Sequence, residues 1–379
     1  MNYYTLNELI SISNEKYNPL KENLDYKCIE LEHIEQETGK IIGYTESKNL
    51  KSIKNKFKVN DVLFGKLRPY LRKYAYPSFE GVCSSEIWVL KANKRIIDNH
   101  YLFYLVQTSR FIRFSNLSTG SKMPRADWTL LRDIEFKVPF LEEQKKIANI
   151  LATWDRAIDL NNDYILNTKK IYQIVSRLIY VNCYLKSDTN YRYQIKDILK
   201  EEVLKTTKNS EYDVLSSTKE NVVKQSDYFN RQIASANNIG YKILKKDRIV
   251  MSPQNAWMGN INYNSDFEIG IVSPSYKVFV INGCELNYVK HLIKTERFIN
   301  LIDSMSIQGA SVVRKNLSID DFLEAEIYLP SVYYQKKHGK VLDAIKDKIK
   351  LLETKQYYLN NQKKGLMQQL LTGKIRVQS

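Results

Sequence analysis

The chain has 379 residues, 43% of them hydrophobic and 12% aromatic, which is enough apolar material for two domains and excludes overall disorder. Lys and Arg number 58 against 42 Asp and Glu, and the formal charge of +16 favours a polyanionic partner. The alternative is a soluble protein whose positive charge reflects only a lysine-rich proteome. Four widely spaced cysteines, no apolar run of about 20 residues and no signal peptide exclude a disulfide scaffold, a membrane span and secretion, so we expect reduced thiols in a cytoplasmic protein.

The first 141 residues are expected to form a mixed α/β domain. Short β-branched and aromatic runs, separated by Gly, Pro, Asn and Ser, predict strands, and one amphipathic helix is predicted near residues 100–114. The dipeptide Val138-Pro139 ends the last strand, because the residue before proline is restricted and proline lacks an amide proton.

A basic segment in this domain is the first candidate DNA contact. Eight Lys or Arg residues lie between residues 51 and 73, against the single acid Asp61, and residues 64–73 interleave cations with aromatics. This composition is typical of a loop that grips phosphates and reaches bases, although a solvated loop would share it. The candidate residues are Lys66, Arg68, Tyr70, Arg72 and Lys73.

A second polar loop, residues 119–125, precedes the last strand of the domain. Its candidate DNA-binding residues are Ser121, Lys122 and Arg125, although the segment could equally be a simple turn.

Residues 142–184 contain no Gly or Pro, and their apolar residues recur with heptad spacing, which predicts one long helix with a coiled-coil seam. The seam residues are Ile147, Leu151, Trp154, Ile158, Ile165, Tyr172, Val175 and Ile179, with Asn161 and Thr168 as polar members.

From about residue 187 the chain repeats its first half, with matched residues 186 to 191 positions apart and in the same order. Residues 4–10 match 193–199, residues 110–112 match 297–299, and Pro139 and Gln144 match Pro330 and Gln335. The duplication predicts a second domain of the same fold over residues 187–331, with its own amphipathic helix near residues 288–302.

The second domain carries different side chains at the equivalent loops. Residues 251–260 are amide-rich, and amides suit the reading of adenine edges more than general contact with phosphates. The candidate residues are Gln254, Asn255 and Trp257, together with Gln308, Ser311 and Arg314 from the loop equivalent to 119–125.

Residues 333–371 predict a second long helix with the same heptad phase as the first. An antiparallel pairing places Asn161 opposite Gln356, Ile158 opposite Leu359, and Trp154 opposite Lys363, whose stem would lie on the indole. The alternative is that each helix packs separately on its own domain.

Motifs for chemistry are missing from the sequence. It contains no Gly-x-Gly-x-x-Gly, no P-loop and no Asn-Pro-Pro-aromatic or Asp-Pro-Pro-aromatic motif of an amino-methyltransferase. Asp25 with Glu46-Ser47-Lys48 imitates part of a nuclease motif, as chance allows in a lysine-rich chain. We therefore expect no catalytic residue, no metal and no cofactor bound by this chain.

The junction at residues 138–151 and the end of the chain at residues 363–376 resemble the spacer helices of type I restriction–modification specificity subunits, and the resemblance covers essentially the whole chain. It implies an α/β fold with two similar mixed α/β target-recognition domains in a pseudo-two-fold arrangement, separated by an antiparallel pair of long coiled-coil helices. The implied divisions are recognition domains at 1–141 and 187–331, a spacer helix at 142–186, and a second spacer helix with the tail at 332–379.

The resemblance also implies partners: double-stranded DNA, two methyltransferase subunits that use S-adenosylmethionine, and an endonuclease or translocase subunit. Two departures from the family pattern suggest unequal docking surfaces. The first helix lacks the Leu-Thr-Gly-Lys tail of the second, and Tyr334 replaces the usual acidic residue before Gln335. The alternatives are a stand-alone DNA-modifying or DNA-cleaving enzyme and a coiled-coil scaffold that binds no DNA.

Overall fold

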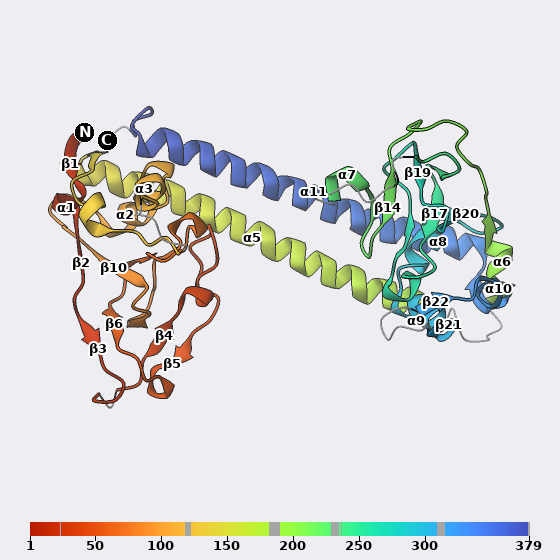
Figure 1. Ribbon diagram of the computed structural model, residues 1–379, viewed down its shortest axis with the longest axis horizontal. Helices are drawn as coiled ribbons and strands as arrows, with labels where there is room; N and C mark the ends of the chain where they lie inside the picture. The colour runs from red at the N-terminus through yellow and green to blue at the C-terminus, as the bar shows by residue number, and fades with distance from the viewer. Residues whose placement is uncertain are drawn as a thin grey trace. The chain divides into compact units, whose positions relative to one another are not determined.

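The computed structural model describes residues 1–22, 24–117, 123–181, 190–228, 235, 237–308 and 315–377. It divides into two compact units, of which the first comprises Met1–Asn162 and Thr354–Ser379 and the second comprises Asp163–Glu353. Two helices of 40 residues each, α5 (Leu141–Tyr180) and α11 (Val332–Leu371), contribute residues to both units (Figure 1).

The first unit is built mainly from antiparallel strands. A four-stranded sheet has the order β2-β10-β7-β8, a five-stranded sheet has the order β3-β6-β9-β4-β5 with β4 and β9 parallel, and β1 pairs with β11. The elements are β1 (Asn2–Thr5), α1 (Leu6–Leu9), β2 (Ile10–Ile12), β3 (Lys16–Tyr17), β4 (Lys27–Ile29), η1 (Leu31–His33), β5 (Thr45–Glu46), η2 (Ser47–Asn49), β6 (Lys54–Phe57), β7 (Val62–Gly65), η3 (Pro69–Leu71), β8 (Tyr74–Ala75), β9 (Gly81–Cys83), β10 (Ile87–Ala92), α2 (Asn99–Leu105), α3 (Ser109–Ser115), α4 (Trp128–Leu131) and β11 (Glu135–Val138).

The second unit repeats part of this plan, but its described residues form no five-stranded sheet. Its four-stranded sheet has the order β13-β20-β17-β18, and β12 pairs with β23 as β1 does with β11. The elements are β12 (Asn190–Gln194), α6 (Ile195–Ile198), β13 (Leu199–Glu201), β14 (Leu215–Ser217), β15 (Val222–Lys224), α7 (Gln225–Tyr228), β16 (Lys242–Lys245), β17 (Arg248–Met251), η4 (Ala256–Met258), β18 (Ile261–Tyr263), β19 (Ile269–Val272), β20 (Lys277–Ile281), α8 (Leu286–Leu292), α9 (Glu296–Ser304), β21 (Ser306–Gln308), β22 (Lys315–Leu317), α10 (Ile319–Glu324) and β23 (Glu326–Pro330). The predicted fold class is confirmed: two similar mixed α/β domains accompany two long helices.

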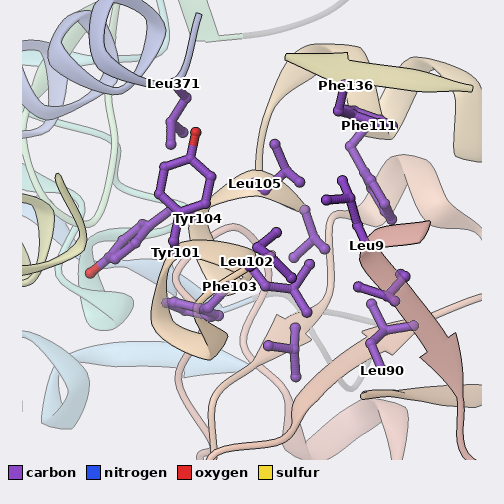
Figure 2. Packing of buried hydrophobic residues seen from close by; sticks show 14 of the residues in the cluster. Leu9, Leu90, Tyr101, Leu102, Phe103, Tyr104, Leu105, Phe111, Phe136 and Leu371 are labelled. Atoms are coloured by element: carbon purple, nitrogen blue, oxygen red, sulfur yellow. The ribbon is translucent and has the colours of Figure 1, made fainter. Parts of the chain in front are cut away.

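Each unit has a core that includes residues of both long helices. In the first unit, α2 supplies Tyr101 and Tyr104, and Leu371 of α11 packs beside them (Figure 2). In the second unit, Tyr180 of α5 and Leu342 of α11 join Phe279 of the sheet. Burial of these apolar side chains attaches the adjoining segments of both long helices to the core of each unit.

The single amphipathic helix predicted in each domain is wrong, because each is broken into two short helices. Residues 100–114 form α2 and α3, and residues 288–302 form α8 and α9. Thr108 and Thr295 precede the second helix of each pair, and each hydroxyl accepts a hydrogen bond from the amide of Phe111 or Phe298. Both threonines have extended backbones, so the N-cap preference of threonine ends one helix and begins the next.

The two long helices pack together and are antiparallel, as predicted (Figure 1). Within the first unit, the Asn161 amide donates to Gln356 Oε1 at 2.7 Å, which confirms the predicted register of the seam. Within the second unit, Lys169 Nζ lies 2.6 Å from Glu353. A polar pair at one layer of an apolar seam disfavours slipped registers, because slippage would bury an unpaired amide.

The contact expected between Trp154 and Lys363 is not the one observed. The Lys363 ammonium forms an ion pair with Asp155, whose other carboxylate oxygen accepts from the Tyr104 hydroxyl at 2.7 Å. Lys363 Nζ also lies 5.7 Å from the centre of the Tyr104 ring. The carboxylate next to the tryptophan offers a stronger partner for the ammonium than the indole face does.

The matched glutamines at the start of the two helices have the same structural role. Gln144 donates from Nε2 to the carbonyls of Pro139 and Ile96, and its Oε1 accepts from the amide of Asp98. Gln335 donates to the carbonyl of Pro330 and accepts from the amide of Glu285. Both side chains are fully buried, so each glutamine holds the start of a long helix against the residue that precedes α2 or α8.

Gln144→Ala or Gln335→Ala should each lower the free energy of unfolding by about 3 kcal/mol, because several buried backbone groups would lose their partners. Urea denaturation followed by circular dichroism measures the change. The exposed Gln362→Ala on α11 is the matched control and should cost less than about 0.5 kcal/mol. Equal stabilities for all three variants would show that water replaces the glutamine bonds without loss.

Residues after α11 contact Glu143, the acidic residue that precedes Gln144 at the start of α5 and has no acidic counterpart before Gln335. Glu143 is buried and accepts from Arg376 Nε at 2.7 Å and Nη2 at 2.6 Å, and from the amide of Val377 at 3.3 Å. The hydrogen bonds from Arg376 hold the pKa of Glu143 below its usual range. At the second junction the equivalent residue, Tyr334, is half exposed. The acid is therefore present where this tail supplies a cation for it.

Candidate nucleic-acid interface

The two loops predicted in the first domain lie side by side. After β7, residues 66–68 run antiparallel to residues 124–126: Leu67 forms a β-bridge with Arg125, and the amide of Arg68 donates to the carbonyl of Pro124 at 2.8 Å. The amide of Ala126 in turn donates to the carbonyl of Lys66 at 2.8 Å. Segments almost 60 residues apart in the sequence thus form one surface. Ser121 and Lys122 lie outside the described residues.

The Lys and Arg side chains of this surface differ in whether they are bonded to other groups of the protein. Arg72 donates to the carbonyl of Gln107 at 2.6 Å and lies 3.4 Å from Glu37, and Lys73 donates to the carbonyl of Leu31 at 2.6 Å. In contrast, the side chains of Lys66 and Arg68 have no hydrogen bond, ion pair or ring contact in the part of the chain that the structure describes. These two cations are therefore available to an external anion, whereas Arg72 and Lys73 stabilise the loop.

Two further side chains complete the surface. Tyr70 has half of its side chain exposed. Arg125 forms a bidentate ion pair with Glu86, at 3.0 and 3.3 Å, and this hydrogen-bonded carboxylate raises the pKa of Arg125. A phosphate that approaches Arg125 would have to compete with Glu86.

The equivalent loop of the second domain follows β17 and is held in the same way. The amide of Leu317 in β22 donates to the carbonyl of Pro253 at 3.2 Å, so the segments after β17 and after β21 again meet. Gln254 is exposed, and its carbonyl accepts from the Trp257 indole at 3.2 Å. Ser311, Arg314 and the side chain of Gln308 lie outside the described residues.

Lys315 is a residue of this surface that sequence reasoning missed. Its ammonium lies 5.0 Å from the centre of the Trp257 ring and also forms an ion pair with Asp303. Nothing in residues 251–260 points to it, because the contact spans almost 60 residues. The signal available in the sequence was only its position beside Arg314, at the end of a predicted polar loop.

The helix pair is joined to the second domain by a buried polar network. His291 of α8 lies between the Tyr172 hydroxyl at 2.9 Å and Asp343 at 2.8 Å, and Lys290 lies 2.7 Å from the same carboxylate. Burial lowers the pKa of His291 to about 4, although Asp343 opposes the shift, so the imidazole is neutral near pH 7. The network ties α5, α8 and α11 together within this unit.

An apolar stripe is exposed along the part of α5 that belongs to the second unit. The exposed fractions of its side chains are 62% for Tyr164, 52% for Ile171, 58% for Ile174 and 68% for Leu178. Each residue precedes a seam residue by one position, so the stripe has the same heptad spacing on a neighbouring face of the helix. Contiguous exposed apolar side chains of this kind mark a surface that another protein covers.

The matching positions of α11 in the first unit carry polar side chains and one glycine. The equivalent residues are Lys355, Gln362, Gly365 and Gln369, and all four are exposed. The two helices therefore offer different surfaces at equivalent positions.

Other features bear on the remaining expectations. Cys28, Cys83 and Cys284 are free thiols, as expected, and Cys183 lies outside the described residues. The described ranges contain no group of three or more side chains that could hold a metal ion. Within the same ranges, no helix has the length and apolar character needed to cross a membrane.

Comparisons with known proteins agree with this picture. Residues 1–168 match the family model described as type I restriction modification DNA specificity domain. The chain is similar to the EcoDI specificity subunit of Escherichia coli, with 34% identity over 135 residues that cover 34% of this chain and 30% of that protein. It is also similar to the MjaVIII specificity subunit of Methanocaldococcus jannaschii, with 23% identity over 332 residues that cover 79% of this chain and 76% of that protein.

A solved structure shares the fold over nearly the whole length. It comes from a study of complex assembly and conformational transition in the type I R-M system, and it matches with a TM-score of 0.64 at 14% identity, covering 99% of this chain and 98% of that chain.

Proposed function

The chain belongs to the non-catalytic DNA specificity subunits of type I restriction–modification systems, and we propose that each of its two recognition domains reads one half of a bipartite DNA target. The recognition domains are residues 1–141 and 187–331, and residues 142–186 and 332–379 set the distance between the half-sites. The observation that carries the proposal is the paired loop surface, which both domains build at the same place with different side chains. A duplicated scaffold with unequal reading residues suits a target of two unlike halves.

In the first domain, Lys66, Arg68 and Tyr70 are the principal DNA contacts, with Arg125, Ser121 and Lys122 beside them. In the second domain, Gln254, Asn255 and Trp257 take this role, with Gln308, Ser311 and Arg314 on the neighbouring loop. Arg72 and Lys73 act mainly by holding the first loop, since both side chains are bonded to distant backbone carbonyls.

We further propose that the helix pair docks two methyltransferase subunits, which bring S-adenosylmethionine, and that an endonuclease or translocase subunit joins the assembly. The exposed stripe on α5 supports this, because its heptad spacing suits an amphipathic helix of a partner. Such a complex would act in the cytoplasm, where the chromosome lies.

The test is a selection from a pool of random DNA duplexes by the full-length chain, alone and with a methyltransferase partner. We expect enrichment of two short half-sites separated by unread base pairs, and no turnover by the chain alone with S-adenosylmethionine or Mg²⁺. Methylation or cleavage by the partner-free chain would contradict the proposal, as would enrichment of no sequence by the assembled complex.

The loop assignment predicts a separation between two double variants. Lys66→Ala with Arg68→Ala should weaken DNA binding and lower the slope of log affinity against log salt by about one to two, because the variant neutralises fewer phosphates. Binding titrations at several salt concentrations measure both quantities.

Arg72→Ala with Lys73→Ala is the matched control, since it removes the same charge from the same loop. It should mainly lower stability, by about 2 kcal/mol, because two carbonyls lose charged donors. If the second pair lowers the salt slope as much as the first, the loop lies on DNA differently from the way we propose.

A further inference from the structure

The two recognition domains place one side chain each at the same point of the same turn. In the first domain, Arg68 follows β7 and immediately precedes η3, and in the second domain Asn255 follows β17 and immediately precedes η4. Both turns end on a left-handed residue, Arg72 with φ 52° and Gly259 with φ 98°. The two turns therefore occupy the same place in their domains, and Arg68 corresponds to Asn255, although Arg68 has φ 51° and ψ 63° whereas Asn255 has φ −127° and ψ 4°.

The backbone of both residues is fixed by hydrogen bonds. The amide of Arg68 donates to Pro124, and its carbonyl accepts from the amide of Leu71 at 2.9 Å. The amide of Asn255 donates to the carbonyl of Ser252 at 3.0 Å, and its own carbonyl accepts from the amide of Met258 at 3.0 Å. A side chain attached to such a backbone starts from a defined point, which lowers the entropy lost when it binds.

Within the part of the chain that the structure describes, neither side chain uses its hydrogen-bonding groups. Asparagine before a helical turn usually accepts from an amide of that turn, but Asn255 makes no such bond, and neither Asn255 nor Arg68 has another side-chain bond in the part of the chain that the structure describes. The neighbouring amides of Asn260 and Asn262, in contrast, donate to the carbonyls of Ser217 and Thr218. Asn255 is thus the asparagine of this loop whose amide is available to a ligand.

The backbone of Arg68 adds a second observation. Its φ of 51° lies in the left-handed region, which costs a non-glycine residue about 1 kcal/mol. Strain of this kind persists only where the surrounding structure holds it, and it is concentrated at functional sites. Glycine at this position would remove the strain, yet the position carries the largest hydrogen-bonding side chain available.

We infer that Arg68 and Asn255 each read a base edge, Arg68 a guanine in the half-site of the first domain and Asn255 an adenine in the half-site of the second. The guanidinium forms two parallel hydrogen bonds with O6 and N7 of guanine, and the carboxamide donates to N7 and accepts from N6 of adenine. Lys66, a flexible point charge, contacts a phosphate instead. The inference rests on the proposed function and names the residues that give each domain its specificity.

The test repeats the selection from random duplexes with variants of the full-length chain in the assembled complex. Arg68→Lys keeps the charge but not the planar fork, so it should lose about ten- to hundredfold of the preference for guanine at one position of the first half-site. The second half-site and the salt slope should not change. Asn255→Ala should lose the preference for adenine at one position of the second half-site and leave the first intact.

Control variants separate base reading from damage to the loop. Lys66→Ala should weaken binding to all sequences alike, and Gln254→Ala should leave the position read by Asn255 unchanged. Arg68→Asn is a second variant for the first domain, because asparagine tolerates the left-handed backbone, and its shorter side chain should lose the preference for guanine at the same position. Urea denaturation shows that each variant is folded.

The outcomes distinguish the inference from the proposed function. If the unaltered complex selects two half-sites but Arg68→Lys and Asn255→Ala leave both unchanged, the inference is wrong and the proposed function stands. Loss of preference over a whole half-site also counts against it, since one side chain should affect one base pair. If the unaltered complex selects no sequence, the proposed function itself fails.

Discussion

Ile174→Glu with Leu178→Glu should leave the chain able to hold one methyltransferase subunit firmly and the other only weakly. Both side chains are more than half exposed on α5, on a face that an amphipathic partner helix would cover. Burying two such side chains contributes about 3 kcal/mol, so their replacement by carboxylates should weaken docking at this end about a hundredfold or more. Glutamate favours helix, so α5 itself should remain intact.

Native mass spectrometry of this chain titrated with the methyltransferase subunit measures the effect. The main complex should change from one with two methyltransferase subunits to one with a single methyltransferase subunit. Gln362→Glu with Gln369→Glu introduces the same charges on the matching face of α11, at the equivalents of Ile171 and Leu178, and is the control. Its effect should be under tenfold, because polar side chains contribute little to an interface. Equal losses for both variants would contradict the assignment of unequal docking surfaces.

The sequence alone predicts the long helices well, because their signals are local and repeated. A heptad seam over some 40 residues predicts both helices and the pairing of their layers, and one amide pair at the seam, Asn161 with Gln356, fixes the register. The breaks at Thr108 and Thr295 escape the same reasoning, because the apolar period continues across them while a single hydroxyl ends the helix.

The candidate DNA surface is less predictable, since composition does not show where a charged side chain points. Residues 66–73 contain four cations that look alike in the sequence. Arg72 and Lys73 are bonded to carbonyls of Gln107 and Leu31, more than 30 residues away, and only the fold brings these groups together. The same holds for Arg125, which meets Leu67 across a β-bridge, and for Lys315, which lies over Trp257.

Lengthening both long helices by seven residues should change the gap between the half-sites and leave the half-sites themselves unchanged. Seven residues are one heptad, so an insertion after Asn162 in α5 and another after Thr354 in α11 preserve the seam on both sides of each insertion. At 1.5 Å per residue, each helix becomes about 10 Å longer, which corresponds to about three base pairs.

The helical twist of DNA limits how far the gap between the half-sites can lengthen. Each added base pair also rotates the second half-site by about 34°, since B-DNA has 10 to 10.5 base pairs per turn, whereas a heptad insertion hardly rotates a supercoiled helix pair. We therefore expect a preferred gap one to three base pairs longer, with weaker binding to the original target. Selection from duplexes that carry the two half-sites at every gap from zero to twelve base pairs measures the preferred length.

An insertion in α5 alone is the control, because it shifts α5 by seven residues against α11 on one side of the insertion. The shift separates either Asn161 from Gln356 or the paired layers on the other side of the insertion. It should lower stability as well as binding, since an amide at the seam would face an apolar residue. An unchanged gap after the double insertion would mean that the helices do not set the distance. Changed half-sites with an unchanged gap would mean that residues of the helices contact bases, because the longer helices would then alter which bases are read and not the distance between the half-sites.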